Sequence, residues 1–598
     1  MTVAPTPQTS PERISVMRLM WRLFNYRPLL FWANIGMWGV FHSLPLAFGY
    51  FAKLIFDALG KHNISFAWLA LGGFALARLG RFGVFTLAFS SFLYLYNLLE
   101  ALLRRNLLAY LLTAPGARTL PDTPAEAVSR FRDDVAGVAE YFEFYLDAAG
   151  ILIFVVVAVF FLWRIDPVVT LVVCAPLLLM ILLVRQLSGR IRAYRRSSRE
   201  ATARVTDFVG ETFGAVSTVK LAAREPQMVA HLEKLGVARR HSALRDVLLT
   251  ELIKSVNTNM VTVGTGLVLL LTAARFRSGG FTVGDFALFA AYLPRLASGM
   301  SFFGNMFAQH RRTGVNFERM NRLLGDAPLD VIVAPGDLHL TGELPAPPPP
   351  PPREKLHELR AENLTALFEN GRGVRNVSLT LQRGQFVVIT GRIGSGKTTL
   401  LRALLGLTPA QGETFWNGRL VSDPASFFVP PRSAYTAQLP QLFSETLRDN
   451  VLTGEGEDRL DRALDLSVLR PDLADLERGL ETLVGARGVK LSGGQVSRSA
   501  AARMFARSAE LLVFDDLSSA LDAETERTLW EGVFENAEGE HERGEATCLV
   551  VSHRRAALLR ADHIVVLREG EVEDKGKLGE LLERSPEMRA LWAEEDPR

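Results

Sequence analysis

The sequence predicts a chain of two halves: an α-helical membrane domain with six transmembrane helices and long cytosolic extensions, followed by an α/β domain. Its 598 residues are 48% hydrophobic and its mean hydropathy is +0.15, which is high for a soluble protein. Six apolar runs in the first half approach or exceed the roughly 20 residues that a helix needs to cross a bilayer. From about Leu364 the apolar runs shorten, and strand and helix patterns alternate between glycines, as in a soluble α/β domain.

The N-terminal segment, residues 1–27, is basic and lacks the short apolar core and small-residue cleavage site of a signal peptide. Its arginines are Arg13, Arg18, Arg22 and Arg27. The apolar residues that recur beside them at helical spacing are Val16, Leu19, Met20 and Leu23. We therefore expect no cleaved signal peptide, and a helix that lies either on the cytosolic membrane surface or on the surface of the protein.

The six candidate membrane helices are joined by alternating short and long connections. They are residues 28–59, 65–96, 142–163, 167–185, 247–274 and 284–308. Long polar helical stretches follow the second and the fourth run, and they carry Arg104, Arg105, Arg118, Arg130, Arg132, Arg190, Arg192, Arg195, Arg196, Arg239 and Arg240. Because basic loops tend to stay in the cytosol, the long loops and both termini are predicted to be cytosolic.

Net charge and cysteine content argue against two classes of function. Lys and Arg number 67 against 64 Asp and Glu, a net charge of +3, so a nucleic-acid binder with a large basic surface is not expected. The two cysteines, Cys174 and Cys548, lie far apart in different contexts. A disulfide framework or a cysteine-based metal site is therefore not expected, and a reducing cytosolic face suits both residues.

A proline-rich linker separates the two halves. The sequence "LPAPPPPPPREK" contains six consecutive prolines at 347–352, which favour a stiff polyproline II rod. At about 3.1 Å per residue the rod is about 19 Å long. We interpret it as an inert spacer, with a recognition motif as the alternative. The predicted organisation is a cytosolic N-terminal segment at 1–27, a transmembrane domain at 28–325, the linker at 326–357 and the α/β domain at 358–598.

A phosphate-binding loop opens the α/β half. "VVITGRIGSGKTTLLRALLGL" is an apolar strand, a loop that matches GxxxxGK[ST], and an amphipathic helix. Glycines let successive backbone amides point at phosphate oxygens, the lysine reaches the terminal phosphates, and the threonine after it offers a hydroxyl to Mg²⁺. The residues predicted to bind ATP here are Gly391, Gly394, Ser395, Gly396, Lys397, Thr398 and Thr399. Strand before and helix after are the context that makes this a P-loop NTPase domain.

Two further stretches are more specific than the phosphate loop. "KLSGGQVSRSAAARMFARSAELLVFDDLSSALD" and "TCLVVSHRRAALLRADHIVVL" follow it in order. With them the chain resembles the ATP-binding cassette (ABC) exporters, half-transporters in which a six-helix membrane domain is fused to one nucleotide-binding domain. The resemblance covers nearly the whole chain. It implies a multi-pass protein of the bacterial plasma (inner) membrane with its nucleotide-binding domain in the cytosol.

The resemblance implies roles for residues outside the phosphate loop. Phe368 falls where an aromatic ring stacks on adenine, although a core phenylalanine at a strand end is the alternative. Gln438 in "YTAQLPQLF" matches the glutamine that touches Mg²⁺ and senses the γ-phosphate, and Asp515 matches the Mg²⁺ carboxylate. The implied metal ligands are thus Thr398, Gln438 and Asp515.

The resemblance also implies a dimer. The motif "LSGGQ" closes over the ATP held by the opposite subunit in this family, and its residues here are Ser492, Gly493, Gly494 and Gln495. "SALD" at 519–522 resembles the loop that crosses the dimer, and His553 matches the histidine that contacts the γ-phosphate, although a lone histidine can also be structural. The expected partner is a second copy of the chain or a related half-transporter.

The membrane half carries its own resemblance. "TPAEAVSRFRDDV" and "ETFGAVSTVKLAARE" lie in the two long loops, where such exporters place short coupling helices. "GGFTVGDFALFAAYL" resembles the entry to the last membrane helix. Long intracellular loops and the membrane-first fusion imply export rather than import, in contact with membrane lipids and with a substrate that the sequence does not specify.

Two residues depart from the family pattern. Ala486 replaces a glutamate that is frequent before "LSGGQ", and Asp516 replaces the catalytic glutamate. Aspartate is shorter by one methylene, roughly 1.5 Å of reach. We therefore expect a slow ATP hydrolase coupled to transport, with Asp516, His553 and Gln438 as catalytic residues. A degenerate half of a heterodimer remains an alternative, as does an ATP-gated channel or regulatory membrane protein.

Two arginines interrupt the second apolar run. Arg78 and Arg81 are three residues apart in "FALARLGRFGVF" and share one helix face. Charged residues at such depth turn toward protein or water. They predict either a cavity site for an anionic or lipid-headgroup substrate, or an internal ion pair with an acid such as Asp147.

Overall fold

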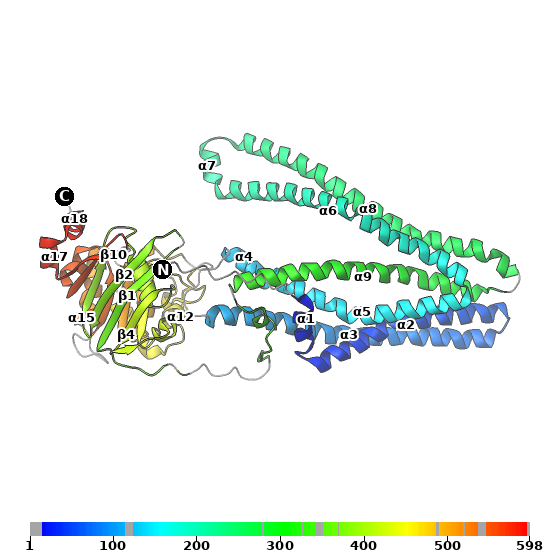
Figure 1. Cartoon of the computed structure of the whole chain (residues 1–598), viewed down its shortest axis with the longest axis horizontal. Helices are drawn as coiled ribbons and strands as arrows, with labels where there is room; N and C mark the ends of the chain where they lie inside the picture. The colour runs from blue at the N-terminus through cyan, green and yellow to red at the C-terminus, as the bar shows by residue number, and fades with distance from the viewer. Residues whose placement is uncertain are drawn as a thin grey trace, which may run out of the picture. The chain divides into compact units, whose positions relative to one another are not determined.

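The computed structural model describes residues 15–113, 123–277, 280–325, 327–340, 349, 351–368, 370–485, 490–517, 521–535 and 546–594. The chain divides into two compact units, a helical one that reaches Leu340 and a sheet-containing one that begins after it. The helical unit and the sheet-containing unit are the α-helical and α/β halves that the sequence predicts (Figure 1).

The helical unit is built from very long helices. Those of more than 30 residues among its described residues are α2 (Pro28–Gly60), α3 (Ile64–Thr113), α5 (Val135–Ile165), α6 (Pro167–Gly214), α8 (Glu225–Arg277) and α9 (Val283–Leu323). Shorter elements are α1 (Val16–Phe24), α4 (Pro124–Ser129), a π-helical turn (Arg130–Asp134) that continues into α5, and α7 (Val216–Leu221). The six long helices contain the six predicted membrane runs in the same order.

The lengths of these helices exceed the thickness of a bilayer. At 1.5 Å per residue, α2 is about 50 Å long and α3 about 75 Å, against a hydrocarbon core of about 30 Å. Apolar windows that suit a membrane span lie in α2, in α3, in the continuous helix 126–165 and in α9, and α8 carries a shorter apolar stretch at Thr262–Ala273. The predicted helical membrane domain with long extensions is confirmed.

Local sequence explains where several helices begin. Thr123 and Glu126 form a capping box at α4, and Thr282 and Asp285 form another at α9. Asp166 follows α5 and accepts hydrogen bonds from the first free amides of α6, so that one residue joins the two helices.

The apolar face of α1 packs within the helical unit. Val16, Leu19, Met20 and Leu23 are buried in the same hydrophobic cluster as residues of α3, α5 and α9, whereas Trp21 is 54% exposed. The helical spacing at the N-terminus thus reflects packing against protein.

The sheet-containing unit has two sheets. The six-stranded sheet has the order β10 (Glu571–Gly576), β9 (His563–Arg568), β3 (Phe386–Thr390), β8 (Thr547–Val551), β7 (Leu511–Asp515), β6 (Ser433–Thr436). It is parallel except for β10. The antiparallel sheet has the order β2 (Gly373–Gln382), β1 (Glu358–Leu367), β4 (Gln411–Trp416), β5 (Arg419–Leu420).

The parallel sheet explains why its strands are continuous apolar runs. Every residue of β3, β7 and β8 is buried, because helices cover this sheet. The helices used below are α10 (Lys397–Leu404), α14 (Gly493–Phe505), α16 (Arg555–Arg560), α17 (Leu578–Arg584) and α18 (Pro586–Glu594).

The carboxyl ends of the parallel strands gather the functional segments at one edge. The phosphate loop follows β3, the Gln438 loop follows β6, β7 ends at Asp515, and the His553 loop follows β8. In open parallel sheets, ligands bind at this edge.

Some predicted features lie outside the described residues. These are residues 1–14 with Arg13, Arg118, the prolines at 347, 348 and 350, Ala486, and the first two residues of "SALD". The domain boundaries predicted from the sequence stay a prediction.

Candidate nucleotide-binding site

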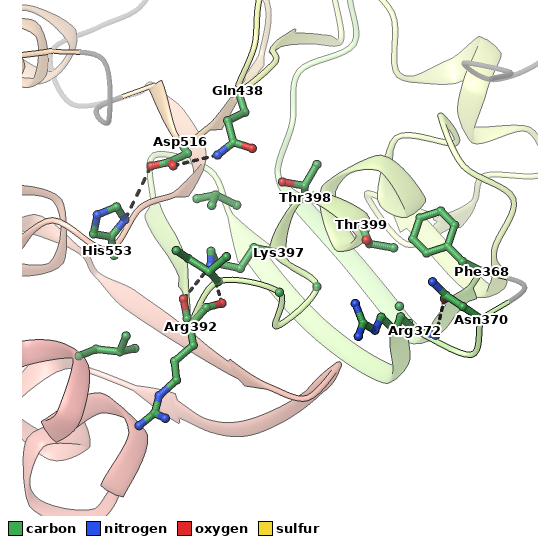
Figure 2. Close-up of a pocket in the computed structure, with 17 residues that line it drawn as sticks. Phe368, Asn370, Arg372, Arg392, Lys397, Thr398, Thr399, Gln438, Asp516 and His553 are labelled. Atoms are coloured by element: carbon green, nitrogen blue, oxygen red, sulfur yellow. Dashed lines mark hydrogen bonds and ion pairs between the residues drawn. The ribbon is translucent and has the colours of Figure 1, made fainter. Parts of the chain in front are cut away.

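A pocket of about 940 Å³ lies at this edge of the sheet (Figure 2). It is lined by residues from segments far apart in the sequence. Those predicted to bind nucleotide or act on it are Phe368, Gly391, Gly394, Gly396, Lys397, Thr398, Thr399, Gln438, Asp516 and His553. Its size suits a nucleotide, since small-molecule pockets usually measure about 300–1,000 Å³.

The phosphate loop needs its glycines for two reasons. Gly391, Gly394 and Gly396 have φ of 148°, 83° and 99°, which L side chains rarely adopt. A Cβ on Gly391 would lie 2.2 Å from the carbonyl oxygen of Leu567, and one on Gly396 would lie 2.7 Å from Cγ1 of Val374. The loop is therefore held close to neighbouring strands, with its end at the positive end of α10.

Lys397 is held inside the loop. Its Nζ donates to the carbonyl oxygens of Gly391, at 2.6 Å, and Arg392, at 3.0 Å. Burial lowers the pKa of Lys397, and the nearby Asp516 and Asp515 partly offset this. A bound phosphate would supply the negative charge that the two carbonyl groups lack.

Asp515 is fully buried behind the pocket. Its Oδ1 accepts from the Thr398 hydroxyl at 2.9 Å, and its Oδ2 accepts from the Tyr435 hydroxyl at 3.0 Å. Burial raises the pKa of Asp515. Burial, together with repulsion from the negative charge of Asp515, raises the pKa of Tyr435 to about 12. Tyr435 was not predicted; its place on β6, three residues before Gln438, is the sequence signal that could have indicated it.

Asp516 is the point where the predicted catalytic residues meet. Its Oδ2 accepts from Gln438 Nε2 at 3.2 Å, and its Oδ1 lies 3.8 Å from Nδ1 of His553. Its amide donates to the carbonyl of Val551, and burial raises its pKa. Its φ is 54°, a left-handed conformation that aspartate adopts more readily than most residues.

Phe368 lies at the far end of the pocket from Asp516, beside Asn370 and Arg372 (Figure 2). Its side chain is 53% exposed, which does not fit a core phenylalanine. An exposed aromatic face suits stacking on a base.

Some of the predicted residues do not line this pocket. Ser395 and Asp515 are buried and are not among its lining residues. Ser492, Gly493, Gly494 and Gln495 lie at the start of α14, where Ser492 and Gln495 form a capping box. The structure thus separates "LSGGQ" from the phosphate loop of the same chain's pocket.

The donor set behind the phosphate loop fits Mg²⁺. Thr398, Gln438 and Asp515 offer hydroxyl, amide and carboxylate oxygens, which are the hard ligands that Mg²⁺ prefers. The described residues contain no group of three or more His, Cys, Asp or Glu that could hold a metal by themselves. The remaining ligands would come from nucleotide phosphates and water.

Arg78 and Arg81 lie on α3 against aromatic rings of α2. The Arg78 guanidinium carbon is 4.4 Å from the ring centre of Phe48, and that of Arg81 is 4.2 Å from Phe41. The predicted alternative of an ion pair with Asp147 is not what the structure shows, because Asp147 pairs with His42 at 2.8 Å.

His42 and Arg295 were not predicted to belong near Arg81. Arg295 donates to His42 Nδ1 at 3.1 Å, and a pocket of about 250 Å³ is lined by His42, Asp147 and Arg295. The available signal was their position as polar residues within apolar runs.

Comparison with known families covers both units. A model described as "ABC transporter transmembrane region" matches residues 40–298, and one described as "ABC transporter" matches residues 374–519.

Individual relatives give the same result. The chain is 26% identical over 500 residues to the probable multidrug resistance ABC transporter ATP-binding/permease protein YheI of Bacillus subtilis. This alignment covers 81% of each of the two chains. It is 26% identical over 496 residues to the ATP-dependent lipid A-core flippase of Ralstonia nicotianae, covering 81% of this chain and 80% of the flippase. It matches the ATP-binding cassette sub-family B member 6 of Xenopus tropicalis over 56% of this chain but only 38% of that protein, at 27% identity.

A solved structure has the same fold. A bacterial Atm1-family ABC exporter with ATP bound gives a TM-score of 0.75 at 20% identity, covering 96% of this chain and 99% of the other. Two family models in order along one chain, together with the site at the sheet edge, place this protein among the ABC transporters, with a transmembrane region and an ATP-binding domain fused in a single chain that has the fold of an ABC exporter.

Proposed function

We propose that the protein is an ATP-driven exporter that works as a homodimer and hydrolyses ATP at two sites shared between its subunits. The observation that carries this proposal is the convergence of Gln438, Asp516 and His553 beside Lys397, while Ser492 lies outside the same pocket. A pocket with the hydrolytic residues but without the "LSGGQ" residues is completed by a second subunit in this mechanism.

Different residues of the pocket bind different parts of ATP. Phe368 stacks on the base, and the backbone amides of the glycine-rich loop bind the phosphates. Lys397 exchanges its hydrogen bonds to Gly391 and Arg392 for the terminal phosphates. Thr398, Gln438 and Asp515 would hold Mg²⁺, which neutralises charge on the phosphates when bound.

Hydrolysis is assigned to Asp516, Gln438 and His553. The oxygen of the attacking water bonds to the γ-phosphorus while the bond from that phosphorus to the bridging oxygen breaks and ADP leaves; the Asp516 carboxylate accepts the proton of the water. Gln438 holds that carboxylate in place, and His553, whose Nδ1 lies 3.8 Å from it, would contact the γ-phosphate in this mechanism. Because aspartate is shorter than glutamate, we expect this step to be slow.

The test is the ATPase activity of the purified full chain in lipid vesicles. We expect Mg²⁺-dependent hydrolysis that rises with dimer concentration and is lost in Lys397→Ala. A protein that dimerises and binds ATP but hydrolyses none contradicts the homodimer. Activity regained with a glutamate-bearing partner would instead support the degenerate half of a heterodimer.

We further propose that Arg78 and Arg81 contribute to a site for an anionic group of the transported substrate. Both guanidinium groups lie on aromatic rings, and Arg81 is close enough to Arg295 for the two positive charges to repel. An anion would relieve this repulsion. Replacing both residues by glutamine should abolish stimulation of hydrolysis by anionic lipids, measured against the rate without substrate; unchanged stimulation contradicts the site.

The basic residues in the long loops indicate the orientation of the protein in the membrane. We propose a bacterial inner-membrane protein with the nucleotide-binding unit in the cytosol, in contact with membrane lipids and not with nucleic acid. Protease accessibility of the nucleotide-binding unit in inside-out vesicles tests the orientation.

A further inference from the structure

The C-terminal helix α18 lies against the wall of the nucleotide pocket. Its Leu591 is one of the lining residues and is itself buried. None of the motifs that identify the site includes a residue of this helix. Two of its side chains contact Arg392 of the phosphate loop and Arg555 at the start of α16, just after the His553 loop.

The first contact joins α18 to the phosphate loop. Glu587 Oε1 lies 2.9 Å from Nε of Arg392, and the Glu587 side chain is 7% exposed. The Arg392 side chain points away from Lys397, whereas its carbonyl oxygen accepts from Lys397 at 3.0 Å (Figure 2). One residue thus links α18 to the lysine that binds the phosphates.

The second contact joins α18 to the start of α16, directly after the His553 loop. The Arg555 guanidinium carbon lies 4.5 Å from the ring centre of Trp592, and Arg555 donates to the carbonyl oxygen of Trp592 at 2.9 Å. Arg555 is the first residue of α16 and follows His553 by two positions.

The helix is itself firmly anchored. Ser585 Oγ accepts from the Met588 amide at 3.0 Å, and Glu573 on β10 accepts from both the Ser585 hydroxyl and the Glu587 amide. Met588 is fully buried in the core. A helix fixed in this way can hold two loops at a constant separation.

We propose that Glu587 and Trp592 are positioning residues of the nucleotide site, with α18 as a brace between the phosphate loop and the His553 loop. This inference rests on the proposed function, since it requires that ATP binds in this pocket. A preorganised loop binds more tightly because less ordering occurs on binding. Glu587 therefore acts mainly on nucleotide affinity, and Trp592, through Arg555 and His553, mainly on turnover.

The first experiment is a double-mutant cycle in the full chain in lipid vesicles. The dissociation constant of trinitrophenyl-ATP is measured for Glu587→Gln, Arg392→Gln and the double variant. Because the Arg392 side chain is 61% exposed, we expect each single change to weaken binding by only about twofold to fivefold. The double variant should bind trinitrophenyl-ATP no more weakly than the more affected of the two single variants, because all three variants lose the same Arg392–Glu587 ion pair.

The matched control breaks another ion pair of the C-terminal segment. Arg584 on α17 contacts Asp574 at 2.7 Å and does not line the pocket. Arg584→Gln should leave the dissociation constant unchanged, which separates positioning of the phosphate loop from general loosening of this segment. Equal weakening in Arg584→Gln overturns the inference.

The second experiment is Trp592→Leu, which keeps an apolar side chain but removes the ring from Arg555. We expect kcat to fall severalfold with a smaller change in KM for ATP, the reverse of Glu587→Gln. Unchanged kinetics with only a lower melting temperature overturns the role of Trp592. Unchanged dissociation constants for Glu587→Gln and Arg392→Gln, or fully additive effects, overturn the role of Glu587. If the unsubstituted chain does not bind the nucleotide, the proposed function fails and this inference fails with it.

Discussion

Replacing Asp516 by glutamate isolates the effect of carboxylate reach on hydrolysis. In the structure the Asp516 carboxylate lies 3.2 Å from Gln438 Nε2 and 3.8 Å from His553 Nδ1, so it already faces both partners. Glutamate extends it by roughly 1.5 Å toward the pocket. Because a misplacement of about 1 Å can cost on the order of 10²-fold in rate, we expect Asp516→Glu to leave kcat similar or raise it by up to about 10²-fold.

The backbone sets a separate cost for this change. Asp516 has a φ of 54°, and a left-handed conformation costs most L-residues about 1–2 kcal/mol. Aspartate and asparagine tolerate it better than glutamate. Asp516→Glu should therefore lower the free energy of unfolding by about 1 kcal/mol or less, even if turnover rises.

Asp516→Asn is the matched control, because it keeps the size and the left-handed preference but cannot accept a proton. We expect a fall in kcat of about 10²-fold to 10⁴-fold with ATP binding retained, and a similar fall for Asp516→Ala. The assay is single-turnover phosphate release by the full chain in vesicles, with nucleotide binding and melting measured in parallel. If Asp516→Ala hydrolyses ATP as fast as the unsubstituted chain, the carboxylate is not catalytic and the slow homodimer is wrong. A slower Asp516→Glu with unchanged binding refutes the argument from reach.

Three further predictions concern the same site. Ser492→Arg and Lys397→Ala should each be inactive alone but regain one working site when subunits are mixed and exchanged; no recovery in the hybrids contradicts a shared site. Tyr435→Phe removes the hydroxyl that donates to buried Asp515, so the free energy of unfolding should fall by about 0.5–1.5 kcal/mol and more Mg²⁺ should be needed for half-maximal hydrolysis; an unchanged Mg²⁺ titration argues against this role. Burial raises the pKa of Asp516, so kcat/KM should fall as pH drops through a value above that of an ordinary aspartate, and this acid limb should be absent from the residual activity of Asp516→Asn.

Much of the fold could be predicted because its signals are local. The apolar runs and the alternation after Leu364 are properties of neighbouring residues, and they predicted the long helices and the strands of the α/β half. The glycines of the phosphate loop are equally local, since positive φ is required within a few residues of Lys397.

The surroundings of the charged residues could not be predicted in the same way. The sequence offered Asp147 as a partner for Arg78 or Arg81, but the packing of α2 against α5 brings His42 to Asp147 instead. Lys53 of α2 likewise forms an ion pair with Asp285 of α9, which is more than 200 residues away. Such pairs depend on which helix faces meet, and periodicity alone does not determine this.

For the nucleotide site, the sequence by itself determined which chemical groups are present and on which strand ends they lie. Only the tertiary structure decided which of them touch. The contact of Tyr435 with Asp515 requires β6 beside β7, and the contacts of Asp516 with Gln438 and His553 require three loops at one sheet edge. The contacts of Glu587 with Arg392 and of Trp592 with Arg555 require α18 to pack beside the phosphate loop and α16. The physical reason is that motifs are set by backbone conformation over a few residues, whereas the geometry of a carboxylate among its partners is set by the packing of segments that are distant in the chain.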